Sequence, residues 1–479
     1  MSEWFGTDGI RRAVHEYPMT ADTVLLIGMA IARHVRTLKP AAPILIGTDT
    51  RQSKDMFAHA LAAGMSAVGT DVVLLGVVPT PGVAFLVRHL GAAAGVVVSA
   101  SHNPYTDNGI KIFDASGFKI SRKQEEAIEA LIIDSVPVPR STEPGTIRFE
   151  PQAVSAYRDF LLNTVASDFQ LPGIQIVLDC ANGAASVLAR EVFEGIGARV
   201  DCIHDRPDGK NINEGCGSEH PKKLAERVLQ RRAAVGFAFD GDADRVVAVD
   251  DTGTVLTGDQ LIAVCADHFR KTGRLRAKPV VTTVMSNVGL RAMLKERHIP
   301  YIGCKVGDRN VMEAMKSCGS VLGGEDSGHM LFLDRHTTGD GMLSAIEILN
   351  VLSAEDKPLS ELAAVMTVFP QALINVPVKA KPDLTTLPDL QADIRRAEER
   401  LGSEGRVLIR YSGTQPMCRV MVEGPSKSLV FYLAETLAAS VRREIGEAVV
   451  EGRQESGVRS QKSGVSSWET GYRSQEKSG

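Results

Sequence analysis

The sequence predicts an α/β protein with three similar mixed-sheet α/β domains and a smaller C-terminal α+β domain around a central cleft. Three observations lead to this fold class. A strand–helix–strand pattern occurs three times, each repeat is followed by a short apolar run that ends in a polar loop, and the order of elements changes near Phe369. Alternating strands and helices favour parallel strands in sheets covered by helices.

The three repeats combine β-branched strands of four to seven residues with helices that carry apolar residues at i, i+3 and i+4. They run from ILIGTDTR at Ile44 to VVLLG at Val72, from IQIVLDCANG at Ile174 to ARVDCIH at Ala198, and from VVTTV at Val280 to PYIGC at Pro300. Ligands bind beyond the carboxyl ends of strands in open α/β sheets. We therefore expect the polar loops of the three units to surround one cleft.

A fourth unit follows, with the strand ALINVPV, the helix LPDLQADIRRAEERL, the strands RVLIRY and CRVMVEG, and a last helix to about Val450. The predicted domains span residues 1–150, 151–255, 256–369 and 370–450. Residues 451–479 are a low-complexity tail with a seven-residue unit that lacks the two apolar positions of a coiled coil. We expect this tail to be disordered.

Composition narrows the class of protein. The 479 residues are 44% hydrophobic and 23% charged, and the formal net charge of −4 gives no argument for a nucleic-acid or anionic-membrane partner, so we expect neither. The seven cysteines form no CxxC pair and lack the spacing of a zinc site or a disulfide framework, which favours a reducing compartment. The start MSEWFGTDGIRR has no apolar signal region, and no apolar run approaches the ~18 residues that span a bilayer. The expectation is a cytoplasmic enzyme.

The most specific motif is FDGDADR, in which Asp240, Asp242 and Asp244 alternate just after a strand. Three such carboxylates cannot all stay buried and charged without a counter-ion. An oxygen-bound divalent cation satisfies them, and Mg²⁺ suits a site that also holds a phosphate. An EF-hand is excluded because Arg245 stands where that loop needs Gly. A solvated polar turn is the alternative.

The second motif is VSASHNP, which contains Ser101 and His102. Ser, Asn and Pro are ordinary turn formers, so a plain turn is the alternative. No GxSxG motif is present, and adjacency in sequence does not establish a Ser–His pair. With the aspartates elsewhere in the chain, we interpret Ser101 as a phosphate carrier whose dianion completes the coordination of the cation.

Two further loops carry polar side chains. In GGEDSGH, Glu325 and Ser327 can point into the same space in an extended segment and hydrogen-bond sugar hydroxyls, and KVGDR at 305–309 can add polar contacts. In RYSGT, Arg410 with its two neighbouring hydroxyls and loosened backbone amides suits a phosphate. A glycine-rich turn and a hairpin loop are the respective alternatives. Together the loops predict phosphoryl transfer on a phosphorylated polyol.

The motifs FGTDGIR, SASHNPYTDNGIKIF, FDGDADR, GGEDSGH and RYSGTQP, in this order, resemble the α-D-phosphohexomutase superfamily. FGTDGIR, NINEGCGSEHP and KVGDR resemble its bacterial branch that acts on glucosamine phosphates. The resemblance covers about residues 3–450. It implies four domains around a cleft, a phosphoserine at Ser101, and one Mg²⁺ held by that phosphoserine with Asp240, Asp242 and Asp244.

The resemblance also implies an activity and residue roles. The enzyme would interconvert glucosamine 6-phosphate and glucosamine 1-phosphate through glucosamine 1,6-bisphosphate, feeding UDP-N-acetylglucosamine and cell-wall precursor synthesis, as a monomer or homodimer. The implied catalytic residues are Ser101, Lys111, Arg245, Arg11 and His329. The implied substrate contacts are Glu325, Ser327, Gly307, Asp308, Arg410, Ser412, Gly413 and Thr414. Lys111 would need a lowered pKa to act as a base.

The sequence departs from the family at Arg12, Asp326 and Gln415, where Gly, Gln and Glu are usual. Three alternatives stay open. The enzyme could be a phosphoglucomutase or phosphomannomutase of the same fold, a metal-dependent phosphatase with Asp240 as nucleophile, or a sugar-phosphate sensor without activity.

Overall fold

The computed structural model describes residues 4–6, 8–39, 41–133, 143–412 and 416–446. The chain divides into two compact units, and each is described by itself. The first comprises residues 1–371 with 423–427, and the second comprises 372–422 with the residues from 428 onward. The tail at 451–479 lies outside the described residues, so its predicted disorder stays a prediction.

The first domain is built on a six-stranded mixed sheet in the order β1-β5-β4-β2-β3-β6. Its strands are β1 (Ile10–Ala13), β2 (Ile44–Thr48), β3 (Val72–Val77), β4 (Ala94–Val98), β5 (Asp107–Asp114) and β6 (Ile147–Phe149). Its helices are α1 (Ala21–Arg36), α2 (Lys54–Ala67), α3 (Thr80–His89) and α4 (Arg122–Ile133). The buried strands β2 and β4 pair in parallel, whereas β4 and β5 pair antiparallel.

The second domain has a five-stranded sheet in the order β11-β10-β9-β7-β8. Its strands are β7 (Gln175–Asp179), β8 (Arg199–Ile203), β9 (Val235–Phe239), β10 (Val246–Asp250) and β11 (Val255–Leu256). Its helices are α5 (Val154–Leu162), α6 (Ala189–Gly195) and α7 (Lys222–Arg231), with short 3₁₀ turns η1 (Pro151–Ala153) and η2 (Ala184–Val187). The predicted boundary at 255/256 falls inside β11, which pairs with β10 in this sheet.

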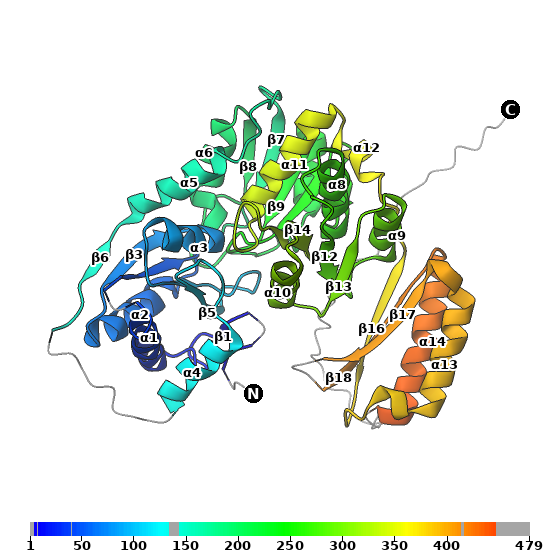
Figure 1. The fold of residues 1–479 in the computed structure, drawn as a ribbon, viewed down its shortest axis with the longest axis horizontal. Helices are drawn as coiled ribbons and strands as arrows, with labels where there is room; N and C mark the ends of the chain where they lie inside the picture. Colours follow the sequence, from blue (N-terminus) through cyan, green and yellow to red (C-terminus); the bar gives the residue numbers. More distant parts are fainter. Residues whose placement is uncertain (1–3, 7, 40, 134–142, 413–415, 447–479) are drawn as a thin grey trace. The chain divides into compact units, whose positions relative to one another are not determined.

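The third domain has a four-stranded sheet in the order β13-β12-β14-β15. Its strands are β12 (Val280–Thr283), β13 (Tyr301–Cys304), β14 (Leu322–Gly324) and β15 (Met330–Phe332). Its helices are α8 (Gly258–Lys271), α9 (Val288–Glu296), α10 (Asp308–Cys318), α11 (Gly341–Glu355) and α12 (Leu359–Ala363). One hydrophobic cluster contains buried residues of both this domain and the second. Figure 1 shows the ribbons of the two domains next to each other.

The same strand order recurs in all three sheets. It reads β3-β2-β4-β5 in the first, β8-β7-β9-β10 in the second and β13-β12-β14-β15 in the third. In each, a parallel strand passes through a loop into an antiparallel strand. These connections are the serine loop (99–106), the aspartate loop (240–245) and the glutamate loop (325–329). The three predicted polar loops therefore occupy equivalent places.

The C-terminal unit has a three-stranded sheet in the order β16-β18-β17. Its elements are β16 (Gln371–Pro377), β17 (Arg406–Tyr411), β18 (Met417–Glu423), α13 (Pro388–Leu401) and α14 (Lys427–Ile445), with the 3₁₀ turns η3 (Leu384–Thr386) and η4 (Gly402–Glu404). Apolar residues of both helices and all three strands form its own core. The predicted fold class, three mixed-sheet α/β domains and a smaller α+β domain, is confirmed.

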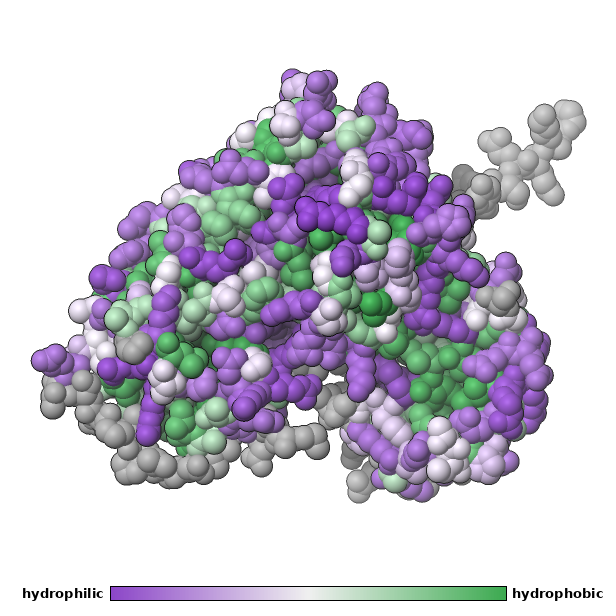
Figure 2. Space-filling view, in the orientation of Figure 1, coloured by the Kyte–Doolittle hydropathy of each residue, from purple (hydrophilic) through white to green (hydrophobic). Residues whose placement is uncertain are grey.

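The visible surface carries mostly polar side chains. On the face shown in Figure 2, hydrophilic side chains predominate, and hydrophobic side chains gather visibly over the C-terminal unit. Across the described ranges, no helix combines the length and apolar character that a membrane span requires.

Candidate active site

Ser101 is fully buried at the start of the serine loop, where it faces the second domain. Its Oγ donates a hydrogen bond to Asp240 Oδ2 at 2.5 Å. Its φ of +52° is left-handed, a conformation that costs a non-glycine residue energy and persists only where neighbours hold it. The loop thus presents the serine hydroxyl directly to the first aspartate of the aspartate loop.

A buried ion pair between Arg51 and Asp49, just after β2, anchors the serine loop through hydrogen bonds. Arg51 Nη2 donates to the carbonyl oxygens of Ser101 at 2.9 Å and Asn103 at 2.7 Å. Arg51 Nε donates to Asp49 Oδ2 at 2.8 Å, and Asp49 also accepts from Ser99 Oγ at 2.6 Å. Sequence reasoning missed this pair, although TDTR at the end of a buried strand was its signal.

The aspartate loop approaches the serine loop backbone to backbone. A Cβ at Gly241 would lie 2.5 Å from the Ser101 carbonyl oxygen, so only glycine fits there. Asn213, which precedes α7 in the second domain, donates through Nδ2 to the same carbonyl at 2.8 Å and to that of Asn103 at 3.0 Å. Asn213 was also missed, because its role depends on a contact between residues 112 positions apart.

The three aspartates are buried, and an oxygen of each lies within 4.8 Å of the others. Burial and the neighbouring Asp244 and Asp242 raise the pKa of Asp240 well above its usual value. Within the described ranges, the buried Oδ1 atoms of Asp242 and Asp244 make no hydrogen bond. Clustered, buried carboxylate oxygens with free lone pairs fit a hard divalent cation such as Mg²⁺.

Lys111, on β5, lies against the same carboxylates. Its Nζ is 2.8 Å from Asp242 Oδ2, 3.0 Å from Asp244 Oδ2 and 3.1 Å from Asp8 Oδ2. Burial by itself would lower the pKa of Lys111, but these carboxylates raise it well above its usual value. Lys111 is therefore an ammonium group in this arrangement, and the lowered pKa that a base would need is not present.

Asp8 connects the first domain to the third. It forms ion pairs with Arg11 and Lys119, and Lys119 also pairs with Asp308 at the start of α10. Burial opposes the charge of Asp8, yet Lys111, Lys119 and Arg11 hold its pKa well below the usual value. The motif GTDGIR contains Asp8, but sequence reasoning considered only its arginine; Lys119 stands in no motif.

Arg245 and His329 complete the charged group. Arg245 Nε is 3.7 Å from Asp244 Oδ1, and its backbone N–H donates to Asp240 Oδ1 at 3.1 Å. His329 Nδ1 is 3.6 Å from Asp244 Oδ1. Burial would lower the pKa of His329, but Asp244 and Asp308 outweigh it and raise the pKa. The imidazole is thereby biased toward its protonated form.

A cavity of about 350 Å³ opens beside these charges. Residues of all three α/β domains line it, among them Asp8, Asp244, Arg245, Gly307, Asp308, Glu325, Ser327 and His329. Glu325 Oε1 accepts a hydrogen bond from Gly307 N at 3.0 Å, which joins the KVGDR and GGEDSGH segments. The cavity is thus lined by residues that the sequence nominated in the second and third domains, whereas Ser101, Lys111 and the other two aspartates are not among its lining residues.

The remaining nominated residues belong to the C-terminal unit. Arg410 is in β17, and Ser412 follows that strand, its carbonyl oxygen accepting from Lys381 Nζ at 2.7 Å. Burial and the nearby Arg419 lower the pKa of Arg410. Gly413 and Thr414, and the departure Gln415, lie outside the described residues, so their predicted contacts stay predictions.

Four domain families match the chain in order. Domains I, II and III of phosphoglucomutase/phosphomannomutase, each described as alpha/beta/alpha, match residues 2–136, 155–253 and 257–369, and the C-terminal domain of that family matches 373–440. The chain belongs to the phosphoglucomutase/phosphomannomutase family. It is accordingly a phosphohexomutase, an enzyme of the isomerase class.

Within this family, the chain is similar over nearly its whole length to proteins named phosphoglucosamine mutase. That of Syntrophus aciditrophicus is 49% identical over 449 residues, which are 93% of this chain and 100% of the relative. That of Syntrophobacter fumaroxidans is 47% identical with the same coverage.

Solved structures of the family share the fold. The phosphoglucomutase/phosphomannomutase family protein of Burkholderia thailandensis has a TM-score of 0.77 at 23% identity and covers 91% of this chain and 97% of its own. The putative phosphomannomutase of Thermus thermophilus has a TM-score of 0.73 at 25% identity, covering 91% and 98%.

Two departures from the family pattern lie at exposed positions. Arg12 is exposed on β1, where its Nη1 donates to the Arg11 carbonyl oxygen at 2.9 Å. Asp326 is exposed in the glutamate loop, and its carbonyl oxygen accepts from Gly258 N at 2.9 Å. Neither side chain interrupts the contacts of the charged group around Ser101.

Proposed function

We propose that this phosphohexomutase interconverts glucosamine 6-phosphate and glucosamine 1-phosphate through a phosphoserine at Ser101. The observation that carries the proposal is the identity of 46–49% to phosphoglucosamine mutases over about nine-tenths of the chain. The 2.5 Å contact between Ser101 Oγ and Asp240 supports the choice of serine.

The reaction has two matched halves. In the first, an oxygen of a sugar hydroxyl forms a bond to the phosphorus of phosphoserine 101, the bond from phosphorus to Ser101 Oγ breaks, and the hydroxyl proton is passed on to Oγ. Glucosamine 1,6-bisphosphate results. It turns over in the cleft, and in the second half Ser101 Oγ takes the other phosphoryl group while the freed sugar oxygen receives the proton.

Lys111 is our first candidate to carry this proton: as an ammonium group it would donate a proton from Nζ to Ser101 Oγ and then take up the proton of the sugar hydroxyl. His329 is the second candidate. Arg245 beside Asp244, and Arg11 paired with Asp8, would provide positive charge where negative charge develops on a transferring phosphoryl group. Asp240, Asp242 and Asp244 would hold a Mg²⁺ together with the serine phosphate, and the ion would offset the charge of the phosphoryl group.

The cavity supplies the substrate contacts. Glu325 and Ser327 would accept and donate hydrogen bonds to sugar hydroxyls, with Gly307 and Asp308 beside them. Arg410, Ser412, Gly413 and Thr414 would bind the phosphate that is not reacting, so that its binding energy positions the other end. Oligomeric state, as monomer or homodimer, and a cytoplasmic location belong to the same proposal.

Comparing substrates tests the choice of sugar. With glucosamine 1,6-bisphosphate as activator, we expect kcat/KM for glucosamine 6-phosphate to exceed that for glucose 6-phosphate and mannose 6-phosphate at least tenfold. A preference for either neutral hexose would instead assign the enzyme to the phosphoglucomutase or phosphomannomutase type.

Mapping the phosphate tests the serine. After incubation with glucosamine 1,6-bisphosphate, intact mass and phosphopeptide analysis should find one phosphate on Ser101, and Ser101→Ala should lose it together with mutase activity. Release of free phosphate by an active Ser101→Ala variant would favour the phosphatase alternative with Asp240 as nucleophile. Binding without turnover by the native chain would favour the sensor.

A further inference from the structure

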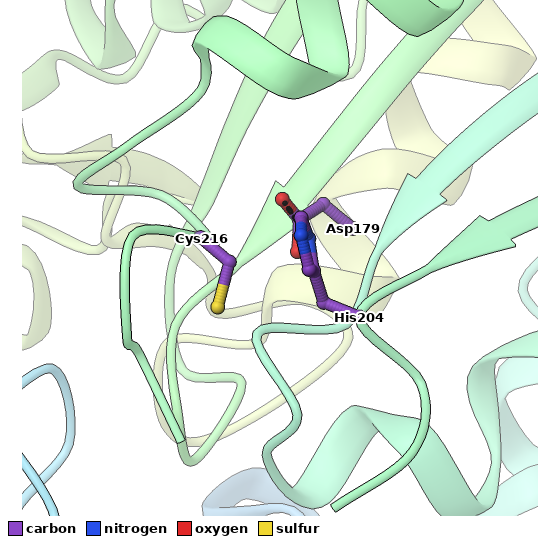
Figure 3. A group of neighbouring side chains, drawn as sticks. All are labelled: Asp179, His204 and Cys216. Carbon is purple, nitrogen blue, oxygen red and sulfur yellow. Dashed lines mark ion pairs between the residues drawn. The ribbon is translucent and has the colours of Figure 1, made fainter. Parts of the chain in front are cut away.

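A second mixed cluster of polar side chains lies in the second domain, separate from the aspartate triad. It consists of Asp179 at the end of β7, His204 just after β8, and Cys216 in the segment that leads to α7. Figure 3 shows the Asp179 carboxylate and the His204 ring against each other, with Cys216 beside them on a third segment of backbone. A carboxylate oxygen, an imidazole nitrogen and the sulfur all lie within 4.8 Å of one another.

The histidine nitrogen in this cluster lacks a hydrogen bond. His204 Nδ1 is 3.0 Å from Asp179 Oδ2, yet this buried nitrogen makes no hydrogen bond to any described residue. The contact lies within ion-pair distance but is not a hydrogen bond. A buried ring nitrogen without a hydrogen bond, close to both a carboxylate oxygen and a sulfur, is available as a metal ligand.

The other two side chains are held in place by neighbours. Asp179 is fully buried and accepts hydrogen bonds from Ala181 N at 2.9 Å and Gly217 N at 3.0 Å. Cys216 is also buried, and Asn182 Nδ2 lies 4.0 Å from its sulfur, as a donor that would stabilise a thiolate. Hydrogen bonds of this kind orient the ligands of metal sites.

We propose that Asp179, His204 and Cys216 bind a borderline transition-metal cation of the Zn²⁺ class, with a fourth position left for water. Oxygen, nitrogen and sulfur donors in one site select such a cation over Mg²⁺, which takes oxygen ligands only. Metal–ligand bonds of about 2.0–2.3 Å place tetrahedral ligands about 3.3–3.7 Å apart, and the three ligand atoms, which lie within 4.8 Å of one another, are near this spacing.

Binding releases one proton. A cysteine coordinates a metal ion as its thiolate, so the cation replaces the thiol proton of Cys216 and this proton passes to solvent.

A cation at this site would stabilise the segment that holds the serine loop in position. Residues 204–217 form the connection that carries Asn213 to the Ser101 carbonyl oxygen, and Gly209 O accepts from Gln52 N at 2.8 Å beside Arg51. A cation joining His204 and Cys216 to β7 would therefore tie both ends of this connection to the sheet.

Cobalt substitution tests the proposal on the full chain. Chelator-treated protein is titrated with Co²⁺ in excess Mg²⁺, which occupies oxygen-only sites, and the thiolate-to-cobalt charge-transfer band is recorded. We expect one equivalent of Co²⁺ to give the band with release of one proton, and Zn²⁺ to abolish the band. No band in the native chain would overturn the proposal.

Variants assign the ligands. Cys216→Ser should lose the band, and His204→Asn should weaken Co²⁺ binding at least tenfold. Residue 204 has a left-handed φ of +49°, which asparagine tolerates, so we expect His204→Asn to fold. It therefore provides an independent test if Cys216→Ser does not fold. Cys304→Ser, in the third domain, is the control that should keep the band. A band that survives in both ligand variants, or that is lost in Cys202→Ser instead, would refute the assignment.

Discussion

Lys111 illustrates how single residues in this protein depend on their partners. Its ammonium group is almost completely buried and faces carboxylates of Asp8, Asp242 and Asp244. Removing one member of a buried ion pair leaves an uncompensated charge, which costs about 3–5 kcal/mol. In a sheet with one solvated face, a lysine at this strand position would be an ordinary surface residue; here it is a counter-ion for the proposed metal ligands.

Replacing this lysine should separate its two roles. We expect Lys111→Met to lower kcat about 10²–10⁴-fold, because the proposed proton carrier is lost. Asp242 and Asp244 would lose their ammonium partner, so added Mg²⁺ should raise the thermal midpoint more in this variant than in the native chain. Steady-state kinetics and thermal unfolding with and without Mg²⁺ measure both effects.

Lys278→Met serves as the matched control, because Lys278 is exposed in the turn after α8. It should change neither kcat nor the response to Mg²⁺. An equal response to Mg²⁺ in Lys111→Met and the native chain would contradict the counter-ion role.

At the scale of elements, the three polar loops occupy equivalent positions, each in the sheet of its own domain. Each connects a parallel strand to an antiparallel neighbour in a sheet of the same order. The backbones of the serine loop and the aspartate loop lie in direct contact, which is possible because residue 241 is glycine. Asn213, from a third segment, donates a hydrogen bond to the serine loop. The position of the Ser101 hydroxyl therefore depends on the second domain as much as on its own loop.

Asn213 is a positioning residue, and we expect Asn213→Gly to lower kcat about tenfold while KM changes little. Two hydrogen bonds to the serine loop are lost, each worth about 0.5–1.5 kcal/mol, and about 1.4 kcal/mol corresponds to tenfold in rate. Glycine accepts the left-handed φ of +60° at this position, so backbone strain does not confuse the result.

Kinetics of both half-reactions and the rate of Ser101 phosphorylation by glucosamine 1,6-bisphosphate measure this effect. A purely structural role would lower the thermal midpoint without a change in kcat of the folded enzyme, and that result would contradict the prediction.

At the scale of the whole first unit, the three α/β domains meet around His336. This buried imidazole lies 3.0 Å through Nε2 from the Pro81 carbonyl oxygen, and its Nδ1 accepts from Thr337 N at 2.7 Å. Thr337 Oγ1 donates to the Gly117 carbonyl oxygen at 2.6 Å, and Tyr157 donates to Asp340 at 2.7 Å. The contacts require neutral imidazole, since Nδ1 is an acceptor.

This requirement predicts an acid-sensitive contribution to stability. Burial lowers the pKa of His336 to about 4 from its usual 6.5. Below pH 6.5 the unfolded chain therefore binds a proton that the folded chain does not, and the free energy of unfolding falls until about pH 4. The full loss is about 3 kcal/mol. Asp340, whose pKa burial raises to about 6, opposes this change, because its folded form takes up a proton first as the pH falls.

Comparing the native chain with His336→Gln separates the contribution of His336 to stability from that of other titrating groups. Gln can keep a donor toward Pro81 and does not titrate. We expect the difference in unfolding free energy, native minus variant, to fall by about 3 kcal/mol between pH 6.5 and 4. Denaturant unfolding across this range measures it, with His59→Gln at an exposed position as control. A pH-independent difference would show that His336 is not the group concerned.

Much of the fold could be predicted because its information is local. Hydrophobic periodicity located the three repeats, and β2, α2 and β3 lie where ILIGTDTR, DMFAHALAAGMSAVG and VVLLG predicted them. Ser101 and the aspartates were found because short motifs name residues whose chemistry is recognisable alone. The same reasoning did not find Asp8, Lys119 or the Arg51–Asp49 pair. A charged residue next to turn residues is expected to be exposed to solvent unless its partner, which lies far away in the sequence, is known.

By itself, the sequence determined the elements, their order, the family and the polar loops, since each of these rests on neighbouring residues and their spacing. Only the tertiary structure decided which charges meet: that Lys111 faces three carboxylates, that Asn213 reaches Ser101, and that Asp179, His204 and Cys216 come together from separate segments. The physical reason is that burial and the distance between charges govern their energies, and both arise only when segments far apart in the chain pack against one another.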